Sequence, residues 1–191
     1  MRINPCLVAI TLALAAAPAH ACPMYLPQQL ADVRYAQTVV VGRITDYRLV
    51  LDPGARRRWR EHVALQRRRD PNYVDTIKPS GFITDYARFT IIVDALLSGR
   101  AGRRIDVTWD ASTFSEPEQM APGQYLIALR DPRGSLPPLR GPSGYVAPGP
   151  GPKAPTVLQA PCSGAFIFPA GSADAARVRA LLRRPQSRTI R

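Results

Sequence analysis

The sequence of 191 residues is poor in the side chains that build metal sites, with only three cysteines and two histidines. So few ligands exclude a zinc-finger array or a multi-metal centre. Lysine is also scarce, because 24 of the 26 basic residues are arginines. Beyond the first 21 residues, no apolar run approaches the roughly 20 residues that a membrane-spanning helix needs. The chain is therefore rich in arginine and has few side chains that could act in catalysis or bind a metal.

The formal net charge is +12, and 46% of the residues are hydrophobic. That hydrophobic content is ordinary for a globular chain and too high for wholesale disorder. The length fits one domain comfortably. Arginine, alanine and proline are together typical of a GC-rich coding sequence, so the charge leaves two interpretations open. It is either a solvated cationic surface or a surface that binds an anionic partner.

The first 21 residues have the pattern of a signal peptide. Arg2 is followed by an apolar stretch over residues 6–17 and by Ala19-His20-Ala21, which fits the small-x-small rule for cleavage. We therefore expect a signal peptide over residues 1–21 and a periplasmic or secreted protein that begins at Cys22. A lipoprotein signal that acylates Cys22, and with it a membrane association, stays open. So does a retained N-terminal anchor.

Two cysteines, Cys22 and Cys162, remain after cleavage, because Cys6 leaves with the signal peptide. Only one intramolecular pairing exists, and an exported protein meets an oxidising environment, so we predict a disulfide between them. It would close a loop of about 140 residues and contribute roughly 4–5 kcal/mol in the chain-entropy model. The alternatives are two unrelated thiols, or an acylated Cys22 and a free Cys162.

Strand patterns dominate the mature chain. They cover residues 38–50, 83–97, 104–109, 123–130 and 164–169. Gly42, inside the first of these, indicates a bulge or a sharp bend. A helix follows, with Ser172 as its candidate N-cap and Pro185 beyond its end. Short strands with a bend glycine and a terminal helix predict a mainly β protein built on a five-stranded OB-like barrel.

Two segments interrupt this pattern. Residues 52–80 form an Arg-rich insertion in which 56–69 has helical character, with Trp59, Val63 and Gln66 along one stripe. Residues 131–161 contain nine prolines and five glycines, which indicates a loop of polyproline or disordered character. We expect a single domain over residues 22–184 that carries both segments, and a basic tail over 185–191.

Several short motifs resemble the netrin-like module, the OB-fold barrel of tissue inhibitors of metalloproteinases and of many secreted bacterial proteins. They are the Ala-x-x-Val-Val-Val-Gly-Arg-Ile of residues 36–44, the strand from Phe89 that ends in Leu-x-Gly at 99, the Ile-x-Val of 105–107, the Gly-x-Tyr-Leu-Ile of 123–127 and the Cys-Ser-Gly of 162–164. The resemblance spans about residues 22–168. It implies the five-stranded barrel.

The inhibitor branch of that family chelates a protease's zinc with the free amine and the carbonyl of an N-terminal cysteine. Only Cys22 could take that role here. The animal inhibitors begin Cys-x-Cys and carry several disulfides, whereas Cys22 is followed by Pro23 and Met24 and has one partner at most. Acylation of Cys22 would block its amine. Inhibition of a zinc metallopeptidase is therefore the alternative function.

The chain offers little for catalysis, and we predict that it is not an enzyme and needs no cofactor or metal. A histidine such as His62 can act as a general base. Because His62 lies among arginines, we expect it to be a surface residue instead. Paired carboxylates could do glycosidase chemistry. The candidates, which also fit solvated loop acids, are Asp106, Asp110, Glu116 and Glu118.

The strongest chemical feature is a run of seven arginines around one tryptophan. Guanidinium groups bind phosphate or carboxylate with two hydrogen bonds, and an indole ring stacks on planar groups or sugars. We expect a binding or scaffolding module of the cell envelope that engages a protein or an anionic envelope component, and no nucleic acid. A solvated insertion without a ligand stays open. The candidate binding residues are Arg56, Arg57, Arg58, Trp59, Arg60, Arg67, Arg68 and Arg69.

Overall fold

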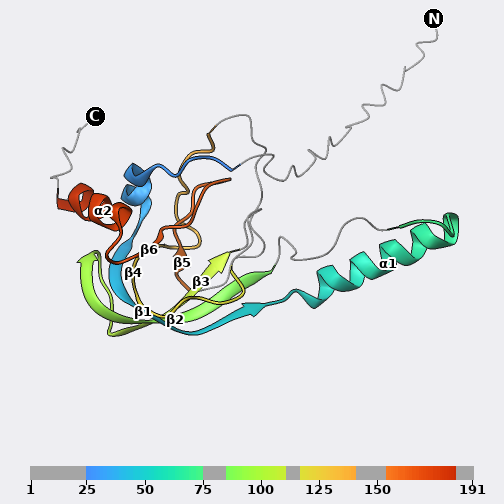
Figure 1. The fold of residues 1–191 in the computed structure, drawn as a ribbon, viewed down its shortest axis with the longest axis horizontal. Helices are drawn as coiled ribbons and strands as arrows, with labels where there is room; N and C mark the ends of the chain where they lie inside the picture. Colours follow the sequence, from blue (N-terminus) through green and yellow to red (C-terminus); the bar gives the residue numbers. More distant parts are fainter. Residues whose placement is uncertain (1–24, 75–84, 111–116, 141–153, 184–191) are drawn as a thin grey trace, which may run out of the picture.

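The computed structural model describes residues 25–74, 85–110, 117–140 and 154–183 (Figure 1). The predicted signal peptide, Cys22 and the basic tail lie outside these residues. The elements are the 3-10 helix η1 (Leu30–Tyr35), β1 (Thr38–Val50), α1 (Pro53–Arg69), β2 (Tyr86–Ser98), β3 (Arg104–Asp110), β4 (Gln124–Arg130), β5 (Thr156–Val157), β6 (Ile167–Pro169) and α2 (Ala173–Arg183).

Five strands close into a mixed barrel. The strand order is β1-β2-β3-β5-β4, and β1 also pairs with β4, which completes the circle. The pairings are antiparallel except for the parallel bridge between β3 and β5. β6 pairs with β4 as an extra strand. The prediction of a mainly β protein with a five-stranded OB-like barrel and a C-terminal helix is therefore confirmed.

The bend at Gly42 is where β1 curves around the barrel. Val41 pairs with Ala95 and Gly42 with Val93, so β2 has one extra residue at this point. A side chain on Gly42 would meet the Ile92 carbonyl oxygen at 2.4 Å. Glycine is required here because the two backbones approach too closely for a Cβ atom. The predicted irregularity at this position is confirmed.

The first part of β1, residues 39–42, and nearly all of β4 are buried on both faces. Val40 and Ile127 point into the barrel with Phe89, whereas Val39 and Leu126 belong to a second cluster outside it. That outer cluster includes residues of η1 and α2, which pack against each other. Burial on two faces explains why Val39–Val41 and residues 125–129 are continuous apolar runs rather than alternating ones.

The strand that closes the barrel is not the one that the sequence predicts. Closure is made by β5, inside the Pro/Gly-rich segment, and the strand after Cys162 is reduced to β6. The loop prediction for 131–161 is therefore wrong at its C-terminal end, while residues 141–153 lie outside the described residues. Thr156, Val157 and Leu158 are almost fully buried there. β5 consists of one threonine and one valine, a segment too short for an alternating or apolar pattern to mark it as a strand.

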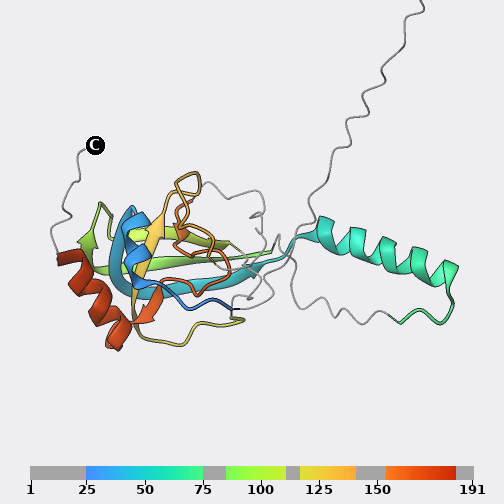
Figure 2. The same ribbon diagram turned by 90° about the horizontal axis from the view of Figure 1, so that it is seen from above.

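The insertion forms a helix that extends away from the barrel. Figures 1 and 2 show α1 leaving the end of β1 and projecting from the sheet in both views. The helix begins at Pro53, three residues earlier than its arginine run suggests, and ends at Arg69 as expected. Its 17 residues correspond to a rod about 25 Å long.

Candidate anion-binding helix

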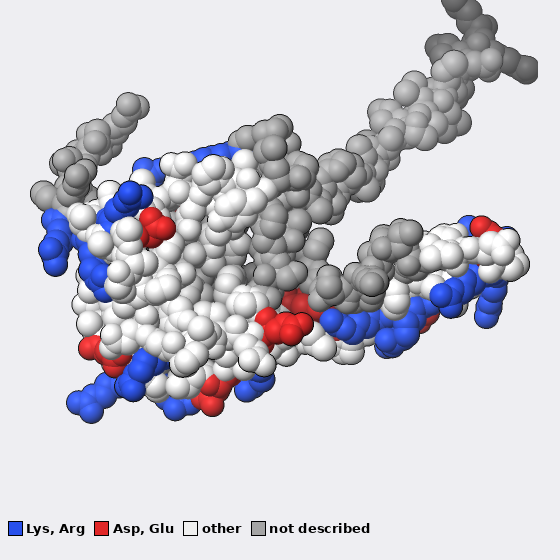
Figure 3. Space-filling view, viewed as in Figure 1, with Lys and Arg blue, Asp and Glu red and all other residues white. Residues whose placement is uncertain are grey.

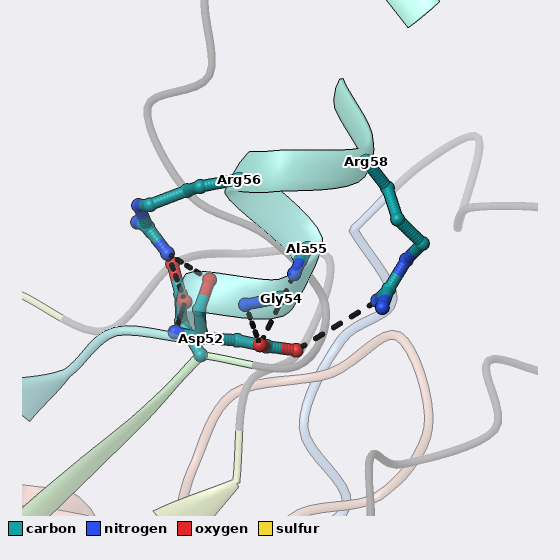
Figure 4. Close-up of polar contacts among 6 residues, drawn as sticks. Asp52, Gly54, Ala55, Arg56 and Arg58 are labelled. Carbon is teal, nitrogen blue, oxygen red and sulfur yellow. Dashed lines mark hydrogen bonds and ion pairs between the residues drawn. The ribbon is translucent and has the colours of Figure 1, made fainter. Parts of the chain in front are cut away.

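The N-terminus of α1 is capped by Asp52. The Asp52 Oδ1 atom accepts hydrogen bonds from the backbone N–H groups of Gly54 (2.7 Å) and Ala55 (3.1 Å), as Figure 4 shows. Pro53 occupies the first helical position, where a missing N–H costs nothing. The Asp-Pro-Gly sequence, which by itself resembles a turn, is here a helix start. The helix is therefore well defined from its first residue.

A second acid fixes this helix start to the barrel. Asp85 directly precedes β2, and its carboxylate receives two hydrogen bonds from the Arg56 guanidinium, at 2.6 and 2.7 Å. Its Oδ1 atom also accepts from the backbone N–H of Asp52 at 2.6 Å. The hydrogen bond to Asp85 raises the pKa of Arg56, against the opposing effect of burial. One carboxylate thus joins the end of β1, the first turn of α1 and the start of β2.

The remaining six arginines of α1 are exposed. Arg58 has only a long contact with Asp52, at 3.9 Å, and its side chain is 66% exposed. Among the described residues, the other five make no ion pair; they are Arg57, Arg60, Arg67, Arg68 and Arg69. Figure 3 shows basic side chains along the length of the projecting helix. Arg56 therefore anchors the helix, and the others face solvent.

Helical geometry arranges the exposed arginines in pairs. At about 100° per residue, Arg60 and Arg67 lie within about 20° of each other around the axis. The same holds for Arg57 with Arg68, and for Arg58 with Arg69, each pair roughly 10–17 Å apart along the helix. Positive charge is therefore distributed along the rod rather than focused on one point. Such a surface suits an extended anion or a charged layer better than one small ligand.

The predicted stripe on α1 is also present. Val63 is buried, and Trp59 and Gln66 are half-buried, whereas most of their neighbours on the helix are exposed. Trp59 thus lies on the side of α1 that bears the fewest arginines. The arginines and the indole ring do not form one mixed face, so any stacking by Trp59 would occur apart from the guanidinium groups.

Of the side chains considered for catalysis, the structure describes those of His62, Asp106 and Glu118. His62 is exposed on α1, and Asp106 is exposed on β3, where it accepts a hydrogen bond from the Thr90 hydroxyl. Glu118 is exposed, while Glu116 and the Asp110 side chain lie outside the described residues. Within the described ranges, no three histidine, cysteine or acidic side chains cluster as metal ligands would.

The region of Cys162 lies next to the start of the described chain. Cys162 is buried and has a positive φ of 63°. The Leu26 N–H donates to the Cys162 carbonyl at 2.8 Å, and Leu26 forms a parallel bridge with Ser163. Cys22 itself lies outside the described residues. The backbone four residues after Cys22 is therefore already held against the Cys162 segment.

Sequence reasoning missed the acids that organise this structure. Asp85 is one of them, and Asp32 is another, 1% exposed in η1 and bound by Arg140 through hydrogen bonds of 2.5 and 2.7 Å. A carboxylate can be recognised as a cap from its local spacing, as Asp52 could have been. Partners separated by 29 or 108 residues leave no local signal.

No protein-family model, curated protein or solved structure matches the chain. In the described part of the chain, no helix has the length and apolar character that crossing a membrane requires.

Proposed function

We propose that this protein is an exported, non-enzymatic binding module of the cell envelope that engages an anionic envelope component through α1. The observation that carries the proposal is the arrangement of that helix. Five of its arginines have no ion-pair partner among the described residues, while a sixth and two acids fix the helix to the barrel. A helix that served only to cover apolar surface would lie against the barrel rather than project from it.

Arginine suits the phosphate and carboxylate groups of the envelope. Its planar guanidinium donates two parallel hydrogen bonds to one oxyanion, and it is more weakly hydrated than the ammonium group of lysine. Phosphates of lipid A, anionic phospholipids and acidic polysaccharides all present such groups in arrays. The spacing of the arginine pairs along α1 favours an array of this kind over a single small molecule.

Export is the premise that selects these partners. The signal-peptide pattern over residues 1–21 supports a periplasmic or secreted location, where nucleic acid is not the available polyanion. The OB-like barrel then serves as the rigid support from which α1 extends. The module would act by binding or scaffolding, without a cofactor or a metal.

Retention on immobilised lipopolysaccharide at moderate salt tests the proposal. A variant with the five unpaired arginines of α1 replaced by glutamine should lose retention. Its matched control removes the same charge elsewhere, by Arg→Gln substitution of Arg100, Arg103, Arg133, Arg177 and Arg183, all exposed. The control should be retained like the wild type. Equal retention of both variants would remove the proposal.

A second candidate function is inhibition of a zinc metallopeptidase by the Cys22 amine, as the resemblance to the netrin-like module implies. The hydrogen bond from Leu26 to Cys162 and the bridge to Ser163 favour it, because they hold the chain near Cys22 against a buried segment. The same contacts support a disulfide between Cys22 and Cys162. The inhibitor function also requires cleavage after Ala21, because that cleavage frees the Cys22 amine.

Mass spectrometry of the intact, exported protein separates these cases. Cleavage after Ala21 and a mass about 2 Da below that of the dithiol form would support the disulfide, which removes two hydrogens. A diacylglyceryl group on Cys22 would exclude both the disulfide and the inhibitor function. It would leave the proposal for α1 intact and place the protein on a membrane.

A further inference from the structure

A β-bulge interrupts β1 shortly before α1. Thr45 pairs with Thr90 and Arg48 with Arg88, so Asp46 and Tyr47 together oppose Phe89 on β2. Asp46 has a φ of 55°, in the left-handed region that non-glycine residues seldom occupy, although aspartate tolerates it better than most. An ion pair with Arg104, at 3.1 Å, holds its side chain. The extra residue is thus maintained at some conformational cost.

The bulge determines on which face of the sheet the Arg48 side chain lies. In a regular strand, Thr45 and Tyr47 would share the outer face and Arg48 would point inward. Instead Tyr47 turns inward and stacks on Phe89, with ring centroids 5.9 Å apart, and Arg48 is exposed. Bulges that redirect a side chain in this way are frequent next to functional sites.

The redirected Arg48 lies directly opposite another arginine. Arg48 and Arg88 are register partners, so their Cβ atoms are about 4.5–5.5 Å apart. Both are exposed, and within the described residues neither forms an ion pair. Like charges directly opposite each other destabilise a strand pair. The fold therefore uses a strained bulge to bring together two groups that repel each other.

Among the described acids, none forms an ion pair with Arg48 or Arg88. Asp46 pairs instead with Arg104. Asp106 accepts a hydrogen bond from Thr90 at 2.8 Å. Two neighbouring guanidinium groups without an ion-pair partner among the described residues can together bind one tetrahedral oxyanion, because each can donate two hydrogen bonds.

We propose that Arg48 and Arg88 form a binding site for a phosphoryl group carrying two negative charges. The inference deepens the proposed function, since it names the chemical group that the anionic partner would present. Arg48 is four residues before Asp52, the cap of α1. A phosphorylated ligand bound here would therefore lie beside the N-terminus of α1. The exposed arginines of α1 would then contact the other negative charges of the ligand.

Titration with inorganic phosphate, followed by NMR of the arginine Nε–H groups, tests the site. We expect saturable shifts at Arg48 and Arg88 that sodium chloride of the same ionic strength does not produce. R48Q and R88Q should each weaken phosphate binding by about tenfold, as expected from losing one charge-assisted pair of contacts. R100Q, which removes an exposed arginine from the β2–β3 turn, should bind like the wild type.

The same variants also allow a test that does not depend on NMR assignment. In chloride buffer, R48Q and R88Q should melt at or above the temperature of the wild type, because each removes a like-charge contact. Phosphate should raise the melting temperature of the wild type and of R100Q but not of R48Q or R88Q. The proposed site would be wrong if chloride and phosphate changed the melting temperature equally, or if phosphate changed the melting temperatures of R48Q and R100Q equally.

Two further arms identify the source of the phosphoryl group. Binding to phosphatidylcholine vesicles that contain phosphatidic acid, if it is weaker in R48Q than in R100Q, supports a lipid headgroup. A phosphate response without vesicle binding supports a soluble phosphate ester. The variant with five glutamines in α1 should keep its phosphate response, so the site and the function proposed for α1 can fail separately.

Discussion

Arg56 and Asp85 form a two-armed ion pair at the base of α1, with nitrogen–oxygen distances of 2.6 and 2.7 Å. The Asp85 side chain is only 9% exposed and that of Arg56 23%. A pair this enclosed behaves differently from surface ion pairs, because removal of one partner leaves a desolvated charge behind. The orientation of the projecting helix therefore depends on one carboxylate that lies outside the helix.

Replacement of Arg56 by alanine should lower the free energy of unfolding by about 1–3 kcal/mol, because the Asp85 carboxylate loses its guanidinium partner. Denaturant unfolding measures this change. Arg58→Ala is the matched control; its pair with Asp52 is long and exposed, so its effect should stay below about 0.5 kcal/mol. Equal effects of the two substitutions would show that the pair does not anchor α1.

The pKa of Arg56 is raised by its hydrogen bond to Asp85, and this sets a pH dependence. A raised pKa in the folded state contributes stability that is fully present below the unfolded pKa and is lost only as pH rises through the folded one. For arginine, that window lies in strongly alkaline solution. The stability difference between wild type and Arg56→Ala should therefore stay constant from pH 7 to about pH 10. A difference that shrinks over this range would contradict the pairing.

Arg140 should be the most sensitive arginine of the Pro/Gly-rich segment. It binds the carboxylate of Asp32, which is 1% exposed, and this contact raises the pKa of Arg140. Arg140→Ala should cost about 2–4 kcal/mol of unfolding free energy, since a buried carboxylate loses its partner. Arg133→Ala, at a residue 93% exposed with a 3.8 Å contact, should change stability little. Comparable losses of unfolding free energy in the two variants would show that the ion pair between Asp32 and Arg140 does not stabilise the fold.

Gly42 should tolerate no side chain. An alanine Cβ atom would approach the Ile92 carbonyl oxygen to 2.4 Å and the Ile91 Cγ2 atom to 2.8 Å. Gly42→Ala should therefore destabilise the barrel by about 2–3 kcal/mol, because two backbones must move apart. At Gly102 the nearest atom would be 3.7 Å away, so Gly102→Ala is the control and should be close to neutral. Thermal unfolding distinguishes the two, and similar melting temperatures would refute the close approach.

Local sequence patterns predicted the parts of this fold that depend on local chemistry. The limits of β1, the bend at Gly42 and the stripe of Trp59, Val63 and Gln66 all follow from propensity and periodicity within a few residues. The start of α1 was missed for a different reason. An Asp-Pro pair such as Asp52-Pro53 occurs both in β-turns and at helix N-termini, and only the helix that follows distinguishes the two cases.

The rest could not be predicted because it depends on pairing between distant residues. β5 has two residues, and a barrel that needs one more strand gives them their role. Asp85 and Asp32 resemble ordinary surface acids until Arg56 and Arg140 are placed beside them. The bulge at Asp46 has no glycine to mark it, so the meeting of Arg48 with Arg88 is also visible only in the fold.

The salt dependence of binding to lipopolysaccharide tests the central claim most directly. For the wild type, the logarithm of the binding constant should fall steeply with the logarithm of salt concentration, since each neutralised phosphate releases counterions. The variant with five glutamines in α1 should show a clearly shallower slope, and the variant with five glutamines elsewhere should keep the wild-type slope. Identical slopes for all three proteins would contradict the assignment of binding to α1.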